Sequence, residues 1–350
     1  YVLTIKLCYN KYINTIKSSS LKEADMSNRI ALWDNLKFIL ITLVVGGHFS
    51  DQLTDYSSIY SSIFLFIYAF HMPLFIFISG YFHSDRNTTK KVLFYISLGF
   101  SYKVISFLVD RINGYSQYTF NLLFDGGLSW FMFVLAIYTF ALFLLRDQNK
   151  KFFLIGSIIL ACFVGYDKSI GDFLYLSRAI IFFPFYMFGT MMKSFDIIEF
   201  KRKYPLLKLV ALLIFIVWGL ICIAKIDTLY GLRYIFTGRN PFPDSIIAYG
   251  ALVRLACYII STVLGASLIL LVTSKKIKWI SDLGKNTINV YFWHYLLFYI
   301  FKPYINFDSI FSSFSFGFIA YSIATIAVTV ILSNKIFSFP VNIIRKQIFT

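Results

Sequence analysis

The chain has 350 residues, of which 58% are hydrophobic, 20% aromatic and only 14% charged, and its mean hydropathy is +0.71. Because a soluble domain carries about 25% charged residues, this composition excludes an ordinary soluble protein and indicates an integral membrane protein. The net charge of +16 does not indicate nucleic-acid binding, because the excess Lys and Arg lie in short connections and termini, where they orient membrane proteins.

Ten apolar runs along the chain are candidates to cross the hydrocarbon as helices. They are residues 30–50, 58–82, 92–109, 128–145, 152–166, 175–192, 206–225, 246–273, 287–303 and 313–334. Cations concentrate in alternate connections, which is expected when both termini face the cytoplasm. The sequence therefore predicts an all-α polytopic membrane helix bundle with about ten transmembrane helices in the cytoplasmic membrane.

The domain boundaries follow from these runs. Residues 29–340 are expected to form one transmembrane domain, because no connection leaves room for a separate soluble domain. Residues 1–28 and 341–350 are expected to be cytoplasmic tails. The stretch before Met26 is either native tail or an upstream extension.

The first run carries three ionisable residues, Asp34, Lys37 and His48. Such groups cost roughly 2.5–3.5 kcal/mol at a helix centre on insertion scales, so they usually face a polar cavity. Lys37 and His48 are eleven residues apart, which places them on one helix face about 16 Å apart, with Asp34 on the same face. Gly46 and Gly47 before His48 let a ligand or another helix approach closely. We expect Lys37 and His48 to point into a common tunnel.

The second run contains FHMPLFIFISGYF, residues 70–82, and is expected to kink at Pro73. Gly80 thins the helix there, and tight helix packing is the simple explanation of such a small residue. His71 either supports His48 across the helix interface or anchors the kink. For each intramembrane histidine taken alone, a helix-packing hydrogen bond is the competing interpretation of a catalytic role.

Further cations lie in or beside the third and eighth runs. Lys90, Lys91 and Lys103 are candidates to bind phosphates together with Lys37. For Lys90 and Lys91, orientation charge explains the residues equally well. Arg254 lies about eight residues into its run, which favours a ligand or a carboxylate partner over snorkelling.

The seventh connection, LYGLRYIFTGRNPFPDS (229–245), is rich in aromatic residues and contains Arg233 and Arg239. Such side chains stack on sugars and hydrogen-bond to them. A loop folded over the bundle surface is the alternative interpretation.

The ninth run begins with LGKNTINVYFWHYLLF (283–298) and is unusually polar in its first half. Asn286, Asn289, Tyr291 and His294 are therefore candidates to line a cavity. An interfacial aromatic belt would explain Tyr291 without any site. The four cysteines lack close spacing, so neither a disulfide framework nor a metal site is expected.

Four motifs in matching order resemble the membrane acyltransferase 3 family. LWDNLKFILITLVVGGHF resembles the opening helix of that family, in which an Arg or Lys is followed by His after ten intervening residues, as in Lys37 and His48. PLFIFISGYF resembles the second-helix signature, SWFMFVLAIY (129–138) the Trp-Phe helix start, and LGKNTINVYFWH the late segment that ends in His. The similarity extends from residue 29 to about 340, and His71 makes it most similar to the fucose 4-O-acetylase-like branch.

The resemblance implies transfer of an acyl group, commonly acetyl, from cytoplasmic acyl-CoA to a hydroxyl of a cell-envelope polysaccharide or its lipid-linked precursor. It implies that Lys37 and nearby cations hold the CoA phosphates. His48 would then carry the acetyl group or deprotonate the acceptor, supported by Asp34, His71 and His294. The implied partners are acyl-CoA, a carbohydrate acceptor, the bilayer and enzymes of glycan biosynthesis, with no bound cofactor.

The chain departs from the family at one point. Family members often carry an Arg-x-x-Arg pair after the second-helix signature, where this chain offers Lys90, Lys91 and Lys103. Lys supplies charge without the bidentate fork of Arg.

A transporter or flippase for lipid-linked sugars is the alternative function, in which the intramembrane charges mark a translocation path. Weak internal symmetry would favour it, and no repeat is visible by eye. A non-catalytic scaffold leaves the shared face of Lys37 and His48 unexplained. The resemblance therefore favours a membrane-bound O-acyltransferase, with acetyl as the expected acyl group.

Overall fold

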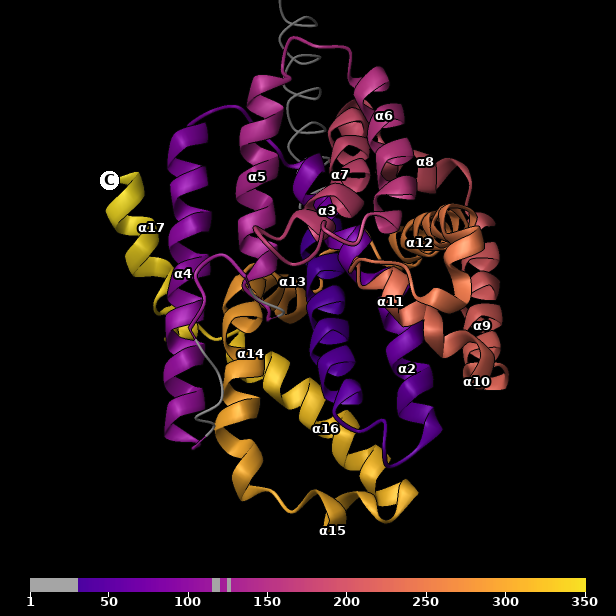
Figure 1. Cartoon of the computed structure of the whole chain (residues 1–350), viewed down its shortest axis with the longest axis vertical. Helices are drawn as coiled ribbons and strands as arrows, with labels where there is room; N and C mark the ends of the chain where they lie inside the picture. Colours follow the sequence, from indigo (N-terminus) through magenta and orange to yellow (C-terminus); the bar gives the residue numbers. More distant parts are fainter. Residues whose placement is uncertain (1–30, 115–119, 125–126) are drawn as a thin grey trace, which may run out of the picture.

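The computed structural model describes residues 31–114, 120–124 and 127–350 (Figure 1). Within these ranges the chain forms α-helices and short 3-10 turns, and apart from an isolated bridge between Phe124 and Phe173 it has no β-structure. The predicted all-α membrane bundle is confirmed. The expected N-terminal tail, residues 1–28, lies outside the described ranges.

Each of the ten predicted runs is helical in the structure, and the second is divided in two. The main helices are Ala31–Asp51 (the first helix), α2 Ser58–Tyr68, α3 His71–Tyr81, α4 Thr88–Ile112, α5 Trp130–Leu144, α6 Lys150–Phe163, α7 Leu176–Met191, α9 Leu207–Ala224, α12 Gly250–Leu271, α14 Thr287–Phe301 and α16 Phe314–Leu332. Shorter helices lie between or after them: α8 Ile197–Lys203, α10 Ile226–Leu229, α11 Arg233–Phe236, α13 Lys278–Gly284, α15 Phe307–Phe311 and α17 Val341–Phe349.

Six helical segments of the described chain are long and apolar enough to cross a membrane. They are Ala31–Asp51, Ser58–Tyr81, Thr88–Ile112, Leu207–Ala224, Asp244–Leu271 and Phe314–Leu332. α9 exposes Leu209, Leu213 and Leu220, as a helix does when most of its surface faces lipid. The other apolar helices are shorter, so ten crossings with both termini in the cytoplasm stay a prediction.

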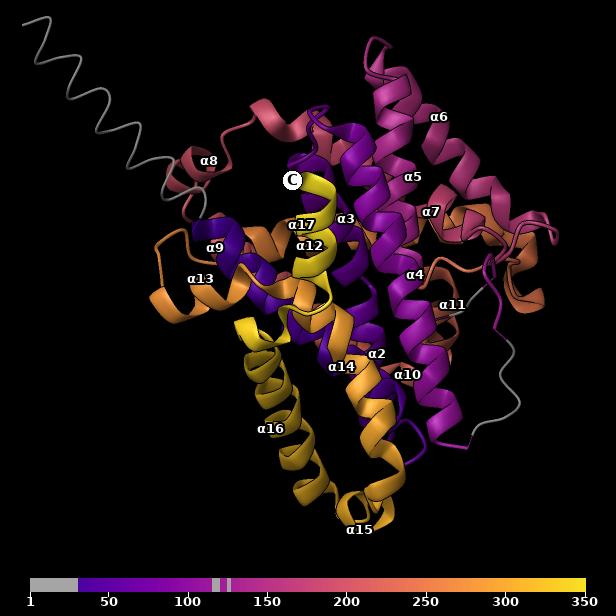
Figure 2. The ribbon, with the colours of Figure 1, turned by 90° about the vertical axis from the view of Figure 1, so that its left-hand side faces the viewer.

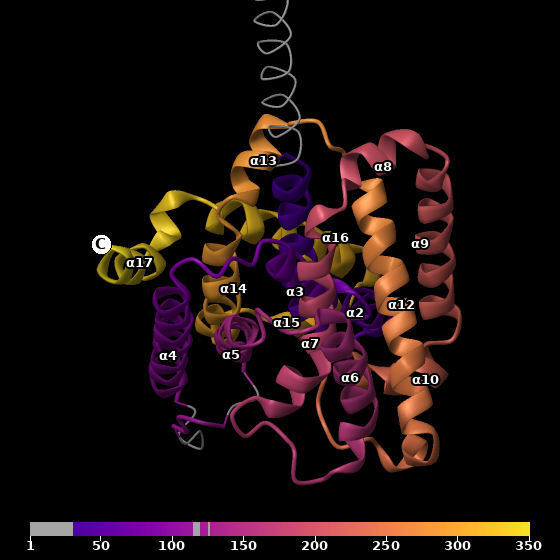
Figure 3. The same ribbon diagram turned by 90° about the horizontal axis from the view of Figure 1, so that it is seen from above.

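α3 and α7 cross in close contact and lie side by side in the middle of the bundle when it is seen from above (Figure 3). A Cβ added at Gly80 would lie 2.1 Å from the carbonyl oxygen of Tyr186, and one at Gly189 would lie 2.1 Å from that of Phe77. The two backbones therefore touch at both positions. Tight packing is what Gly80 provides.

The predicted kink in the second run is a complete break between Tyr68 and His71. Pro73 has no N–H, so the carbonyl of Ala69, four residues earlier, loses its helical partner. That carbonyl instead accepts a hydrogen bond from Ser261 Oγ of α12. The break places His71 at the first turn of α3.

Residues 341–350, which are expected to be a cytoplasmic tail, form the helix α17 Val341–Phe349 up to the last residue. α17 lies against α4 (Figure 2), where the ring of Phe349 meets that of Phe94 at a centroid distance of 6.1 Å. The guanidinium of Arg345 lies 5.5 Å from the centre of the Phe94 ring. The same view shows α14 and α16 running side by side to α15.

Candidate active site

A cavity of about 760 Å³ lies at the His48 end of the first helix. Its walls come from the first helix, α2, α3, α4, α7, α14 and the connection between α9 and α12. Of the predicted site residues, it is lined by His48, His71, Tyr291, Arg233 and Arg239. These positions are far apart in the sequence, and the fold brings them together around one space.

His48 is half-buried and presents its ring to this cavity. Its Nδ1 is hydrogen-bonded to the hydroxyl of Tyr68 at 3.1 Å. The ring centres of His294 and Tyr295 lie 5.3 and 5.2 Å from that of His48. The imidazole is therefore held in one orientation by neighbours from α2 and α14, as a group that transfers protons or acyl groups must be.

Gly46 and Gly47 allow this environment by admitting neighbouring helices. A Cβ at Gly46 would lie 3.0 Å from the hydroxyl of Tyr321, and one at Gly47 would lie 3.1 Å from the ring of Tyr68. Tyr321 also donates a hydrogen bond to the Gly46 carbonyl at 3.0 Å. Of the two predicted uses of these glycines, the structure shows close approach of helices.

His71 and His294 belong to the same cluster. The ring of His71 lies 4.6 Å from that of Tyr68. Nδ1 of His71 donates to the Ile67 carbonyl at 2.9 Å and Nδ1 of His294 donates to the Val290 carbonyl at 2.8 Å. Because carbonyls only accept, each neutral ring keeps an unprotonated Nε2. Among the described residues, the buried Nε2 of His294 has no hydrogen-bond partner.

Of the two roles that the sequence leaves open for His71, the structure shows the anchoring of the helix break, and support of His48 stays a prediction. It bonds to the last turn of α2 across the helix break, and its ring lines the cavity of His48. A break beside a functional group is common in membrane helices, because freed backbone groups are tolerated where they line a cavity.

The rest of the cavity lining combines aromatic rings with both signs of charge. Arg233 lies 4.0 Å from the centre of the Tyr230 ring and donates to the Tyr234 hydroxyl at 2.9 Å. Arg239 pairs with Asp172 at 2.5 Å. Asp51 and Asp110 line the same space. These side chains offer donors, acceptors and flat apolar faces together.

Arg178 is a cavity residue that sequence reasoning missed. It lies in the first turn of α7, is only 6% exposed and stacks at 4.9 Å on the ring of Trp130. In the sequence it resembles an orientation cation of the fifth connection. The sequence signal that could have identified Arg178 is its position inside the sixth apolar run, after the polar residues of the fifth connection.

Lys37 and Asp34 lie at the other end of the first helix. Lys37 Nζ is 2.8 Å from Asp34 Oδ1, and neither residue lines the cavity. Gly284 of α13 covers the helix here, since a Cβ at that glycine would lie 2.0 Å from the Asp34 carbonyl oxygen. The shared face of Lys37 and His48 stands, because the helix is continuous and separates them by about 16 Å. This cavity is lined by His48 but not by Lys37, so a common tunnel that joins the two residues stays a prediction. Asp34 pairs with Lys37.

Lys103 does not join Lys37. Its ammonium donates to the Leu122 carbonyl at 3.1 Å and to the Tyr175 hydroxyl at 3.0 Å. It lies fifteen residues along α4 from Thr88, which corresponds to about 22 Å of helical rise. The structure therefore uses Lys103 to hold the connection between α4 and α5. Lys90 and Lys91 begin α4 at the Lys37 end, where Lys91 donates to the Ser84 carbonyl at 2.6 Å.

Arg254 is fully buried and does not line the cavity, and no carboxylate in the described part of the chain forms an ion pair with it. Its guanidinium donates to the Ile235 carbonyl at 2.9 Å and to the side-chain oxygen of Asn240 at 3.4 Å, and it lies over the ring of Phe242. The acceptor assignment of Arg254 is therefore corrected, because its contacts anchor the α9–α12 connection to α12.

The two asparagines of the ninth run also lie outside the cavity lining. Asn286 donates to the Ser333 carbonyl at 3.0 Å and so joins α14 to the end of α16. Asn289 is buried one turn later. Tyr291 does line the cavity, and its hydroxyl donates to the Leu128 carbonyl. Only the part of this run that follows the asparagines belongs to the site.

A family model described as an acyltransferase domain matches residues 30–334. The chain belongs to the acyltransferase 3 family. No curated protein and no solved structure matches the chain. Family membership makes the chain a membrane acyltransferase, and the matched range contains the whole histidine cluster. The cavity beside His48 is therefore the candidate active site of this acyltransferase.

Proposed function

We propose that the chain is an O-acyltransferase that moves an acyl group, most simply acetyl, from cytoplasmic acyl-CoA to a hydroxyl of a cell-envelope carbohydrate or its lipid-linked precursor. The observation that carries the proposal is the position of His48 at the wall of a large cavity, backed by two further histidines. Histidine is the side chain best suited to proton transfer near neutral pH.

In the proposed reaction, His48 takes the proton of the acceptor hydroxyl as that oxygen attacks the thioester carbonyl. The C–S bond then breaks, the acyl C–O bond is complete, and the CoA thiolate leaves with the proton. The Tyr68 hydroxyl keeps the ring in place, and Nε2 of His294 is an acceptor beside the positive charge that His48 acquires. A general base of this kind contributes about 10²–10⁴-fold to the rate.

The cavity wall supports a carbohydrate as the acceptor. Tyr230, Tyr234 and Tyr295 supply flat faces, and Arg233 and Asp51 supply a donor and an acceptor for hydroxyl groups. Sites that orient small ligands combine apolar and aromatic walls with a few placed polar groups. A cavity of this kind accommodates a sugar ring without requiring net charge.

In the proposal Lys37 binds the donor phosphates, as the family spacing implies. In the proposal the ammonium exchanges part of its contact with Asp34 for a phosphate oxygen at the membrane surface. The helical rise of about 16 Å between Lys37 and His48 suits the extended pantetheine arm of CoA.

The test is acetyl transfer by the purified chain in proteoliposomes, read from ester signals in the NMR spectrum of the acceptor glycan. We expect His48→Ala to lower kcat by at least about 100-fold while the protein elutes as a folded species. Tyr304→Phe, at an exposed position outside the cavity, is the matched control. Full glycan acetylation by His48→Ala would refute the role of His48.

Lys37 is tested separately. Lys37→Ala is expected to raise KM for acetyl-CoA about tenfold with little change in kcat, because a phosphate contact is made equally before and during the reaction. Lys37→Arg, which keeps the charge, is the control. An unchanged KM in Lys37→Ala would remove the donor-binding role.

A further inference from the structure

A second hollow, of about 50 Å³, lies at the Lys37 end of the bundle. Its charged lining comes from three places in the chain: Asp85 between α3 and α4, Arg146 and Lys150 at the α5–α6 turn, and Lys193 after α7. We call it the basic pocket. α3 is about 15 Å long, and His71 lies at the end of α3 that is far from the basic pocket. The basic pocket is therefore distinct from the candidate active site.

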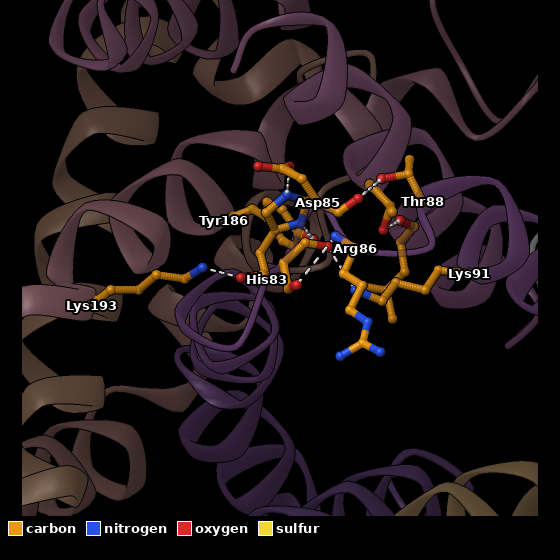
Figure 4. A network of polar contacts seen from close by, with 10 residues as sticks. His83, Asp85, Arg86, Thr88, Lys91, Tyr186 and Lys193 are labelled. Carbon is orange, nitrogen blue, oxygen red and sulfur yellow. Dashed lines mark hydrogen bonds and ion pairs between the residues drawn. The ribbon is translucent and has the colours of Figure 1, made fainter. Parts of the chain in front are cut away.

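The wall of the basic pocket is held by a hydrogen-bonded network (Figure 4). His83 donates from Nε2 to Asp85 at 2.9 Å, and its Nδ1 accepts from the Tyr186 hydroxyl at 3.0 Å. The ammonium of Lys193 reaches across from the end of α7 to the His83 carbonyl. The network fixes the α3–α4 connection against α7 and so gives the pocket a defined shape.

The charges around this pocket do not balance. Among the residues that the structure describes, three cations line the pocket, whereas Asp85 is the only carboxylate in the lining and is already bonded to His83. Asp147 is bonded at 3.1 Å to Arg146 from outside the lining. Burial lowers the pKa of Lys193 below its ordinary value, Lys150 and Lys91 lower it further, and Asp85 opposes them. Lys150 is therefore close enough to Lys193 to repel it.

The backbone adds to this positive field. α6 begins at Lys150, so its N-terminus lies at the edge of the pocket, where the side-chain oxygen of Asn149 caps the N–H groups of Lys151 and Phe152. A helix N-terminus carries about half a positive charge and favours anions. Membrane orientation requires cations only somewhere on this surface; it does not require three of them to converge on one hollow beside a helix N-terminus.

We propose that the basic pocket binds a single phosphate group at the membrane surface. A volume of about 50 Å³ has room for one small group and not for a nucleotide base. The phosphate has two possible sources, the CoA part of the acyl donor or the headgroup of an anionic lipid. The first source rests on the proposed acyl transfer, and the second does not.

Binding is measured first, without acyl transfer, by calorimetry of the full-length chain in detergent with adenosine 3′,5′-bisphosphate and with inorganic phosphate. We expect Arg146→Gln/Lys150→Gln/Lys193→Gln to weaken binding of both at least about tenfold, and Lys276→Gln, an exposed cation outside the pocket, to leave it unchanged. Arg146→Gln/Lys150→Gln keeps the Lys193 contact and serves if the triple variant fails to fold. Equal affinity in the variant and the unchanged chain overturns the proposal.

Two kinetic arms then identify the source. If the donor supplies the phosphate, the variant loses the preference for acetyl-CoA over acetyl-dephospho-CoA that the unchanged chain shows. If a lipid supplies it, the variant loses the stimulation by phosphatidylglycerol in proteoliposomes of otherwise neutral lipid. Loss of either response supports the pocket, and retention of both overturns it. Phosphate binding can be measured by calorimetry even if the chain shows no transferase activity. A wrong assignment of the proposed function can therefore be distinguished from a pocket that does not bind phosphate.

Discussion

The α3–α7 crossing makes a quantitative prediction for Gly80→Ala. The new Cβ would lie 2.1 Å from the Tyr186 carbonyl oxygen, whereas real Cβ contacts do not fall below 3.0 Å. The two helices must therefore separate by at least the difference, 0.9 Å. Both partners are backbone, so no side-chain rotation relieves the contact. Overpacking of this kind costs about 1–3 kcal/mol of unfolding free energy.

The crossing also predicts how two substitutions combine. Gly189→Ala places its Cβ 2.1 Å from the Phe77 carbonyl oxygen at the same crossing, so one separation of the helices relieves both contacts. The double variant is therefore expected to lose less stability than the sum of the single variants.

The assay is the unfolding free energy in detergent micelles, followed by tryptophan fluorescence with increasing denaturant. The matched control is Gly156→Ala in α6, where an added Cβ meets no atom within 4 Å and the better helix propensity of Ala stabilises by about 0.5–1 kcal/mol. Gly80→Ala and Gly156→Ala should thus shift stability in opposite directions. A Gly80→Ala variant as stable as the unchanged chain, or fully additive losses in the double variant, would refute the reasoning.

Three further predictions follow from single side chains. Tyr68→Phe removes the hydroxyl that is bonded to Nδ1 of His48. We expect kcat to fall about tenfold with an unchanged unfolding midpoint, because one hydrogen bond is lost. An unchanged kcat would contradict the positioning role of Tyr68. Arg254→Gln should lower the unfolding free energy by about 1.5–3 kcal/mol because a charged hydrogen bond to the α9–α12 connection is lost, while kcat of the folded enzyme is retained. Burial, which outweighs the bond to Asp85, lowers the pKa of His83 below 6.5, so its contribution to stability is present above pH 6.5 and is lost as the pH falls. Unfolding measured between about pH 7.5 and 5.5 should therefore show a smaller loss in His83→Gln than in the unchanged chain, and equal losses would contradict this.

The sequence predicts the helices well because the signal for them is local. Long apolar runs between polar connections indicate where each helix begins and ends, and the eleven-residue interval between Lys37 and His48 fixes their shared face. His71 and His294 could be selected because an imidazole inside a membrane helix is costly and needs a reason. Their contact with one another through Tyr68 and His48 could only be proposed.

The partners of the buried cations are not local, so the sequence does not reveal them. Lys103 and Arg254 bind carbonyls of Leu122 and Ile235, and these carbonyls belong to connections that fold back over the helices. Any segment can provide such an acceptor. A cation inside a membrane run therefore indicates that a partner exists, without distinguishing a phosphate from a peptide group.

The origin of the cavity wall bears on how relatives of this chain diverge. The groups that contact His48 belong to α2 and α14. Arg233, Tyr234 and Arg239 belong to the connection between α9 and α12, which Arg254 attaches to α12. Residues of that connection can change without moving the imidazole. Under the proposed function, changes in that connection would alter which acceptor is bound, while the groups around His48 stay unchanged.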